Sequence, residues 1–156
     1  MANITMKGKD AIAANQAECF VTIGTRRYNF MIATKVEARF EKNKVEVPIL
    51  GRTGKGNKPN GWKGTGSLTI HYVSPIFRQL MERYKDTGED FYFDMQITNE
   101  DPGSTAGRQT VILFDCNLDS GILAQFDADG DVLMEDMDFT FDDFKFPESF
   151  ALLPGM

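Results

Sequence analysis

Stretches in which hydrophobic and polar residues alternate recur through the first half of the chain. Such alternation places one set of side chains on each face of an extended strand. β-Branched and aromatic residues, which favour strands, are concentrated in the same stretches. The strands predicted for this half are Glu18–Ile23, Tyr28–Glu41, Lys44–Leu50 and Ser67–Val73, with a turn at Gly24–Arg27. The first two strands are expected to form a hairpin, and a glycine-rich stretch joins the last two.

The second half shows the same pattern, most clearly near its end. The strands predicted there are Asp90–Thr98, Thr110–Leu118, Gly121–Asp127 and Val132–Phe144. In the last of them, Met137, Phe139 and Phe141 face one way, whereas Asp138, Thr140 and Asp142 face the other. One face of this strand is therefore expected in the core and the other in solvent.

One helix separates the two halves. Ser74 can cap its first turn, and Pro75 suits the first helical position, where no amide hydrogen is required. Gly88 is typical of the residue that ends a helix. The helix predicted over Pro75–Lys85 has an apolar stripe of Ile76, Phe77, Leu80, Met81 and Tyr84 to pack on a sheet, with Arg78, Glu82, Arg83 and Lys85 outward. The fold class predicted is mainly β with one helix.

Length and composition favour one ordinary domain. A chain of 156 residues is long enough to bury about two thirds of the surface that it exposes when unfolded. It has no run of about eighteen apolar residues and no leader with an apolar core, so we expect a soluble protein made and kept inside a cell. Cys19 and Cys116 lie far apart, and we expect both to be buried small residues and not a disulfide.

The charge is divided unevenly along the sequence. Residues 1–85 hold fifteen Lys and Arg against six Asp and Glu, which gives +9, and residues 86–156 hold two against seventeen, which gives −15. The two halves sum to the net charge of −6. These are either two solvated faces of one domain or unlike surfaces that meet between copies, since complementary potentials steer association.

The stretch GRTGKGNKPNGWKGTG, Gly51–Gly66, contains six glycines, four basic residues and the only tryptophan. A phosphate-binding P-loop would need a second glycine followed by Lys and then Ser or Thr, and would open a helix, whereas this stretch leads into a strand. A second interpretation is a nucleic-acid-binding loop, in which the basic side chains contact phosphates and the tryptophan stacks on a base. The net negative charge of the chain disfavours it. A loop that contacts protein or solvent remains.

Searches for catalytic and metal chemistry find little. The segment DADGD, Asp127–Asp131, spaces carboxylates as calcium loops do, but Val132 and Asp138 stand where an EF-hand needs Gly and Glu. A hairpin turn at Asp129–Gly130 explains it better. His71, the only histidine, has no neighbour in sequence for a zinc site or a triad. No catalytic residue, metal ligand or cofactor site is predicted.

The run from Phe40 to Ile97 resembles the tail tube proteins of contractile phage tails, in particular those of PBSX-like defective prophages and phage-tail-like bacteriocins. The resemblance rests on EKNK (Glu41–Lys44), on GR followed by a glycine-rich stretch ending in GTG (Gly51–Gly66), and on the strand-to-helix junction with its glycine-closed helix leading into YF. The ending DFTFDDFKFPESF, Asp138–Phe150, is similar to the family's final strand. Met1–Gln16 is longer and richer in alanine than the resemblance implies.

The resemblance implies an antiparallel β-sandwich or open barrel with one helix, and no enzymatic activity. It implies six copies in a ring, rings stacked into a hollow tube, a contractile sheath around the tube and DNA passing through its bore. The implied partners are further copies of the chain, the sheath protein, and the baseplate or initiator and tape measure proteins. The tube would be assembled in the host cytoplasm as part of the virion tail, without a membrane anchor.

Three sets of residues are expected to act in assembly if the resemblance holds. An arm between two strands would reach a neighbouring subunit through Arg52, Lys55, Lys58, Trp62 and Lys63. The outward face of the helix, Arg78, Glu82, Arg83 and Lys85, would face the sheath. The candidate acids of the bore are Asp127, Asp129, Asp131, Asp136, Asp138 and Asp142, some of which could instead receive the basic arm.

Two other functions stay open at this point. One is the tube protein of a cellular injection apparatus whose cargo is protein. The other is a monomeric ligand-binding or metal-dependent β-domain, which would not associate as its concentration rises.

Overall fold

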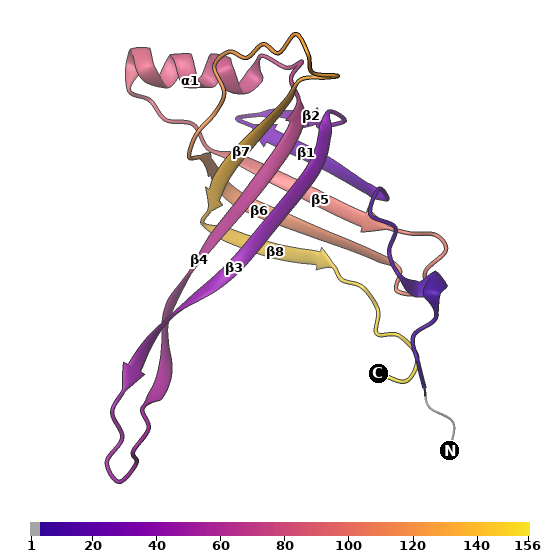
Figure 1. The fold of residues 1–156 in the computed structure, drawn as a ribbon, viewed down its shortest axis with the longest axis vertical. Helices are drawn as coiled ribbons and strands as arrows, with labels where there is room; N and C mark the ends of the chain where they lie inside the picture. The colour runs from indigo at the N-terminus through magenta and orange to yellow at the C-terminus, as the bar shows by residue number, and fades with distance from the viewer. Residues whose placement is uncertain (1–3) are drawn as a thin grey trace. The chain divides into compact units, whose positions relative to one another are not determined.

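The computed structural model describes residues 4–156 and is mainly antiparallel β-structure with one α-helix in that range (Figure 1). Its elements are η1 (Gly8–Asp10), β1 (Ala17–Ile23), β2 (Arg26–Asn29), β3 (Ala33–Val47), β4 (Gly56–His71), α1 (Ile76–Thr87), β5 (Phe93–Glu100), β6 (Arg108–Leu118), β7 (Met134–Phe141) and β8 (Asp143–Glu148). The predicted fold class is confirmed. The chain forms two compact units, each built from segments that are distant in sequence.

The first unit contains the described residues up to Met31, Tyr92–Asp115 and Asp143–Met156. Here β1 lies between β2 and β5, and the early part of β6 pairs with β8, all antiparallel. Val21 lies opposite Met95 in the register of β1 and β5, and both are fully buried. The predicted hairpin of β1 and β2 is confirmed, with its turn at Gly24 and Thr25.

The second unit contains Ile32–Phe91 and Cys116–Asp142. In it β4 pairs with β3 on one side and with β7 on the other. Leu68 of β4 faces Met137 of β7 in this register, and the two are buried together with Ile70 and Phe139. The buried positions on β7 are those that the alternation predicted.

The boundaries of β2 and β3 differ from the prediction of one strand over Tyr28–Glu41. The chain leaves β2 at Phe30, whose side chain is buried and whose amide donates a hydrogen bond to the carbonyl of Cys19. The second strand then begins at Ala33 and continues to Val47, so Lys44–Leu50 is not a separate strand. Residues that favour strands continue across this break, so their pattern did not predict it. The break begins where the Phe30 side chain is buried.

The glycine-rich stretch Gly51–Gly66 was expected to be a loop, and this is wrong for most of its length. β4 begins at Gly56, so only residues 48–55 connect β3 to β4. The arm is therefore a long β-hairpin.

Three predictions about the chain after β6 also need correction. Gly121–Asp127 is not a strand, because its hydrophobic residues Leu123 and Phe126 are exposed instead of packing on a sheet. The hairpin turn expected at Asp129–Gly130 is also wrong: the turn is at Ala128–Asp129, closed by the Gly130 amide donating to the carbonyl of Asp127, and it lies within an irregular loop and not between two strands. The predicted strand Val132–Phe144 is divided by a bend at Asp142 into β7 and β8.

The helix begins one residue later than predicted and ends two residues later. Pro75 is its N-cap, and the amide of Ile76 donates a hydrogen bond to the Ser74 hydroxyl (3.4 Å). Gly88 ends the helix with a φ of 74°, and its amide donates to the carbonyl of Tyr84. No helix within residues 4–156 is long and apolar enough to cross a membrane.

Both cysteines are buried and neither is in a disulfide, as predicted. Burial raises the pKa of the Cys19 thiol to about 12, because a thiolate would lose its hydration there. The two residues act as small apolar side chains.

Of the segment Met1–Gln16, residues 1–3 lie outside the described part of the chain. Asp10 accepts hydrogen bonds from the amide and the hydroxyl of Thr105, which lower the pKa of its carboxyl. The amide of Ala13 donates to Asp101 (2.9 Å). These bonds attach the segment to the connection between β5 and β6.

Candidate assembly surfaces

The hairpin of β3 and β4 extends past the third strand of its sheet. β4 pairs with β7 only from Gly64 to His71, whereas β3 and β4 continue to pair as far as Val47 and Gly56. Residues 41–63 therefore form a two-stranded ribbon, which projects from the second unit (Figure 1). An isolated two-stranded ribbon is marginally stable in water. We call residues 41–63 the arm.

Aromatic side chains hold the base of the arm. The Trp62 ring stacks on that of Phe40 at 5.2 Å between centroids and lies 6.3 Å from that of Phe141. Phe141 in turn lies against Gly64, where an added Cβ would meet its ring at 2.3 Å. Glycine at position 64 thus leaves room for the ring. These contacts fix the direction in which the arm leaves the sheet.

The register of the arm shifts between Lys42 and Lys44. Gly61 lies at this shift with a φ of 85°, in the left-handed region that glycine adopts without strain. The shift is therefore a β-bulge built on a glycine.

The five predicted arm residues lie together on this hairpin, two of them in its loop and three on a strand. Arg52 and Lys55 are in the connection between the strands, and Lys58, Trp62 and Lys63 are on β4. Lys55 pairs with Glu46 at 3.7 Å and Lys63 with Glu41 at 3.5 Å. Arg52 and Lys58 form no ion pair with any residue in 4–156. Residues 41–63 carry six cations against two acids, which leaves +4.

The end of the arm is also hydrophobic. Leu50 is fully exposed and Ile49 is 41% exposed. The two residues add exposed hydrophobic surface to the cationic end of the hairpin.

The helix α1 does not present Arg78 to solvent, contrary to the prediction. The Nη1 atom of Arg78 donates to both carboxylate oxygens of Glu135 at 2.9 and 3.0 Å, and Nη2 donates to the carbonyl of Ser74. Its guanidinium lies 4.2 Å from the centroid of the Tyr72 ring. Glu135 is 1% exposed, so this ion pair is largely buried. It fastens α1 to β7.

The other predicted helix residues divide between the two faces. Phe77 is buried and Ile76, Leu80 and Met81 are half-buried, but Tyr84 is exposed although it was expected to pack on the sheet. The three remaining polar residues, Glu82, Arg83 and Lys85, are exposed.

Asp136 and Asp138 lie on the face of β7 opposite the buried residues. The hydroxyl of Thr69 donates to the Asp136 carboxylate at 2.6 Å, and Asp138 lies opposite Ser67 in register. Asp142 is exposed in the bend after β7. The structure thus places three of the six candidate acids at or beside one sheet face.

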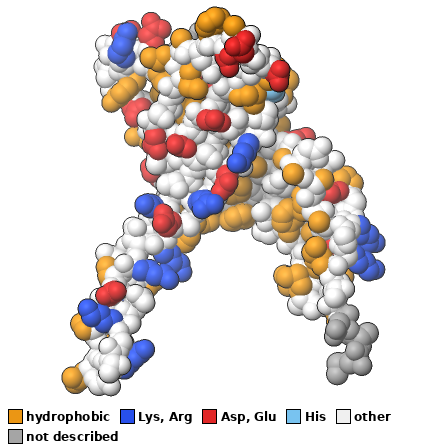
Figure 2. All heavy atoms as spheres, viewed as in Figure 1, with side chains coloured by type: hydrophobic (Ala, Val, Ile, Leu, Met, Phe, Trp, Pro, Cys, Tyr) orange, Lys and Arg blue, Asp and Glu red, His pale blue; other side chains and the backbone are white. Residues whose placement is uncertain are grey.

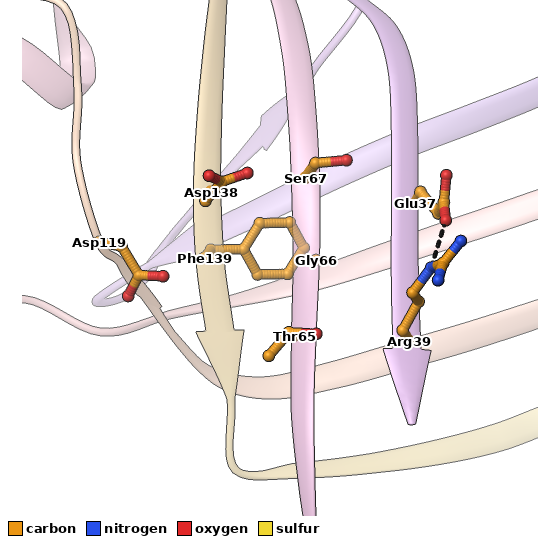
Figure 3. Close-up of a pocket in the computed structure, with 8 residues that line it drawn as sticks. All are labelled: Glu37, Arg39, Thr65, Gly66, Ser67, Asp119, Asp138 and Phe139. Atoms are coloured by element: carbon orange, nitrogen blue, oxygen red, sulfur yellow. Dashed lines mark hydrogen bonds and ion pairs between the residues drawn. The ribbon is translucent and has the colours of Figure 1, made fainter. Parts of the chain in front are cut away.

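A depression of about 340 Å³ lies on this face (Figure 3). It is lined by Glu37, Arg39, Thr65, Gly66, Ser67, Asp119, Asp138 and Phe139. Arg39 donates to Glu37 at 2.6 Å, and this bond lowers the pKa of the Glu37 carboxyl. The depression therefore carries one ion pair of β3 beside Asp119 and Asp138. Across residues 4–156, no three His, Cys, Asp or Glu side chains gather as they would around a metal ion.

The remaining acids, Asp127, Asp129 and Asp131, lie in the irregular loop 119–133. The Asp127 carboxylate accepts the amide of Asp129 at 3.1 Å, and the Gln125 amide nitrogen donates to the carbonyl of Met134 at 2.6 Å. These bonds order a loop that has no strand pairing of its own.

Sequence reasoning missed Glu135 and the two glycines that face Phe139 and Phe141. Glu135 could have been found, because it continues the alternation of Met137 and Phe139 onto the buried face.

The chain matches known proteins in sequence and in fold. Residues 4–148 match the family of phage tail tube proteins, and this match includes the arm, α1 and all eight strands. The chain belongs to the phage tail tube protein family. It is therefore a structural component of a phage tail, as the resemblance implied. The match also includes residues 4–16, most of the segment Met1–Gln16.

Relatives of this tail tube protein occur in Bacillus subtilis strain 168. The protein XkdM of the phage-like element PBSX is 43% identical over 115 residues, which cover 74% of this chain and 78% of XkdM. A solved structure of a protein from Bacillus subtilis is 34% identical, with a TM-score of 0.54, and covers 86% of this chain and 98% of that chain.

More distant structures share the fold. A chain from the baseplate of the anti-feeding prophage has a TM-score of 0.62 at 11% identity, covering 94% of this chain and 97% of that one. A chain from the sheath-tube complex of an extracellular contractile injection system has a TM-score of 0.58 at 14% identity, covering 84% and 88%. At these identities the likeness shows a shared fold.

Proposed function

We propose that the whole chain, both units together, is one subunit of the inner tube of a contractile phage tail. Six copies form a ring, the rings stack into a tube inside a sheath, and DNA passes through the bore. The tube assembles in the host cytoplasm together with baseplate or initiator and tape measure proteins. The arm supports this proposal most directly.

The arm favours assembly because residues 41–63 have no third strand to stabilise them. A ribbon of this kind gains stability when its exposed side chains pack on a partner. A contact between the arm and an unlike surface on another copy is heterologous, and such contacts close into rings or extend along an axis. The proposed role of the arm is to join one subunit to another.

Deleting residues 44–60 tests the arm. The deletion joins Asn43 to Gly61 between Lys42 and Trp62, which are partners in the register. Asn-Gly is a favoured two-residue hairpin turn, so the shortened hairpin is expected to close and the subunit to fold. We expect a folded protein, measured by circular dichroism, that forms no tubes in sedimentation and negative-stain microscopy.

The matched control is Gly54→Ala, which keeps the full arm. A Cβ at Gly54 meets no atom within 4 Å, so this variant is expected to form tubes as the parent does. Tubes formed by the shortened protein would contradict a joining role for the arm.

The two faces of the second unit suggest which side lies toward the bore. The ion pair of Arg78 and Glu135 holds α1 on the buried face of β7, and Asp136 and Asp138 lie on the opposite face. If α1 faces the sheath through Glu82, Arg83 and Lys85, that opposite face lies toward the bore. Carboxylates there repel DNA phosphates, whereas a wall of cations would hold them by releasing counterions.

A cryo-EM structure of the assembled tube tests both placements at once. We expect Asp136, Asp138 and Asp142 to line the bore and α1 to lie on the outer surface. Side chains of Asp136 and Asp138 on the outside of the tube would exclude the proposed lumen, and α1 inside the bore would exclude the proposed sheath contact.

A further inference from the structure

The end of the arm, which comprises the connection and the first residues of β4, combines positive charge with exposed hydrophobic residues. Residues 48–58 contain Arg52, Lys55 and Lys58 and no acid. Ile49 and Leu50 are exposed in the same segment. We call residues 48–58 the basic tip.

The loop between β6 and β7 has the opposite charge. Residues 119–133 contain four acids and no basic residue. Three large hydrophobic residues of this loop are strongly exposed: Leu123 (73%), Phe126 (89%) and Val132 (70%). We call residues 119–133 the acidic loop. The acidic loop is therefore opposite in charge to the basic tip, and both segments expose hydrophobic side chains that can pack together.

The basic tip and the acidic loop lie at opposite ends of the second unit (Figure 1). The tip ends at Lys58, the third residue of β4, and the loop is fastened at the other end, where the Tyr72 amide donates to the carbonyl of Leu133. Residues 59–71 of β4 lie between them, a length of about 40 Å at about 3.3 Å per residue. The two surfaces therefore cannot meet within one copy.

Figure 2 shows Lys and Arg side chains along the arm and hydrophobic side chains at its end, with acidic and hydrophobic side chains at the opposite end of the view. Complementary surfaces at opposite ends of one unit can pair only between copies, head to tail. Such a contact repeats along an axis.

We propose that the basic tip of one copy docks on the acidic loop of a second copy in the adjoining ring. The inference rests on the proposed joining role of the arm and names the site that receives it. Leu50 packs among the exposed hydrophobic residues of the loop, and Arg52 and Lys58 pair with Asp129 and Asp131. The hydrophobic contact excludes water around these pairs and so strengthens them.

The local contacts show which charges are available for docking. The Asp127 carboxylate already holds the turn by accepting the Asp129 amide, and Lys55 already pairs with Glu46. The side chains of Asp129 and Asp131 form no ion pair or hydrogen bond with residues 4–156. They can be exchanged without breaking a contact that orders the loop.

Charge exchange tests the docking site. The tip variant is Arg52→Glu with Lys58→Glu, the loop variant is Asp129→Lys with Asp131→Lys, and the third protein carries all four substitutions. We expect each double variant to raise the protein concentration needed for tube formation by at least about tenfold, since each turns attraction into repulsion. The fourfold variant restores opposite charges at every contact, and we expect it to form tubes near the parent's concentration. Sedimentation over a concentration series measures this.

The matched control reverses Lys7 and Lys9 to Glu, two exposed residues before β1, which changes the net charge as the tip variant does. It is expected to leave the concentration for tube formation unchanged. Circular dichroism of each soluble protein confirms that it is folded.

The outcomes separate the docking site from the role of the arm. If the arm deletion abolishes tubes but the loop variant assembles as the parent does, the arm joins subunits at another site and the acidic loop is excluded. If both double variants fail and the fourfold variant fails equally, the two surfaces do not pair. If the arm deletion itself still forms tubes, the joining role is wrong.

Discussion

Replacing Arg78 with methionine is expected to lower the free energy of unfolding by about 3–5 kcal/mol. The substitution leaves the carboxylate of Glu135, which is 1% exposed, without its partner. A buried charge that loses its counter-charge keeps the cost of desolvation and gains nothing in return. Denaturant unfolding followed by circular dichroism measures the change.

Two further proteins separate the ion pair from the helix surface. Arg83 pairs with Glu89 at 3.0 Å with both side chains about two-thirds exposed, so Arg83→Met is expected to cost less than about 1 kcal/mol. Arg78→Met combined with Glu135→Leu removes both charges and is expected to recover most of the stability. Equal losses for Arg78→Met and Arg83→Met would show that the buried pair contributes no more than a surface pair.

The alternation of residues predicted the buried face of β7 because that face is a local property. Met137, Phe139 and Phe141 are buried, and Asp136 and Asp138 are exposed. The same period places Glu135 among the buried residues. Its partner Arg78 lies 57 residues earlier, and the rotation of α1 that brings the two together depends on how the helix packs.

The arm shows where local reasoning about glycine fails. Six glycines over Gly51–Gly66 favoured a loop, yet β4 begins at Gly56. Gly64 and Gly66 pair with Phe141 and Phe139 of β7, and these rings occupy the space that side chains on β4 would fill. The reason for the glycines therefore lies on a strand about seventy residues away, which no local pattern contains.

In the acidic loop, the sequence pattern predicted a strand that the structure does not contain. Leu123 and Phe126 suggested a strand over Gly121–Asp127, but a strand requires a neighbouring strand to pair with, and this segment pairs with none in residues 4–156, which leaves both side chains exposed. The basic half of the sequence contributes the three cations of the basic tip, and the acidic half contributes the four acids of the acidic loop.

Replacing Gly66 with alanine is expected to lower the free energy of unfolding by about 2–3 kcal/mol, as overpacking in a core does. An added Cβ would lie 2.4 Å from the Phe139 ring and 2.7 Å from the carbonyl oxygen of Glu37. The ring is 1% exposed and the carbonyl belongs to the backbone of β3, so neither can move away at little cost. Thermal and denaturant unfolding measure the loss.

Gly54→Ala is the matched control, because it makes the same chemical change where no atom lies within 4 Å. Both substitutions restrict the unfolded chain alike, an effect of about 0.4–1 kcal/mol that favours folding, so their difference isolates the clash. The clash with Phe139 also predicts non-additivity: in a Phe139→Leu background, Gly66→Ala is expected to cost less than in the parent, because the ring that it strikes is gone. Equal costs in the two backgrounds would assign the loss to the Glu37 carbonyl alone, and equal stability of Gly66→Ala and Gly54→Ala would contradict the packing of Phe139 over β4.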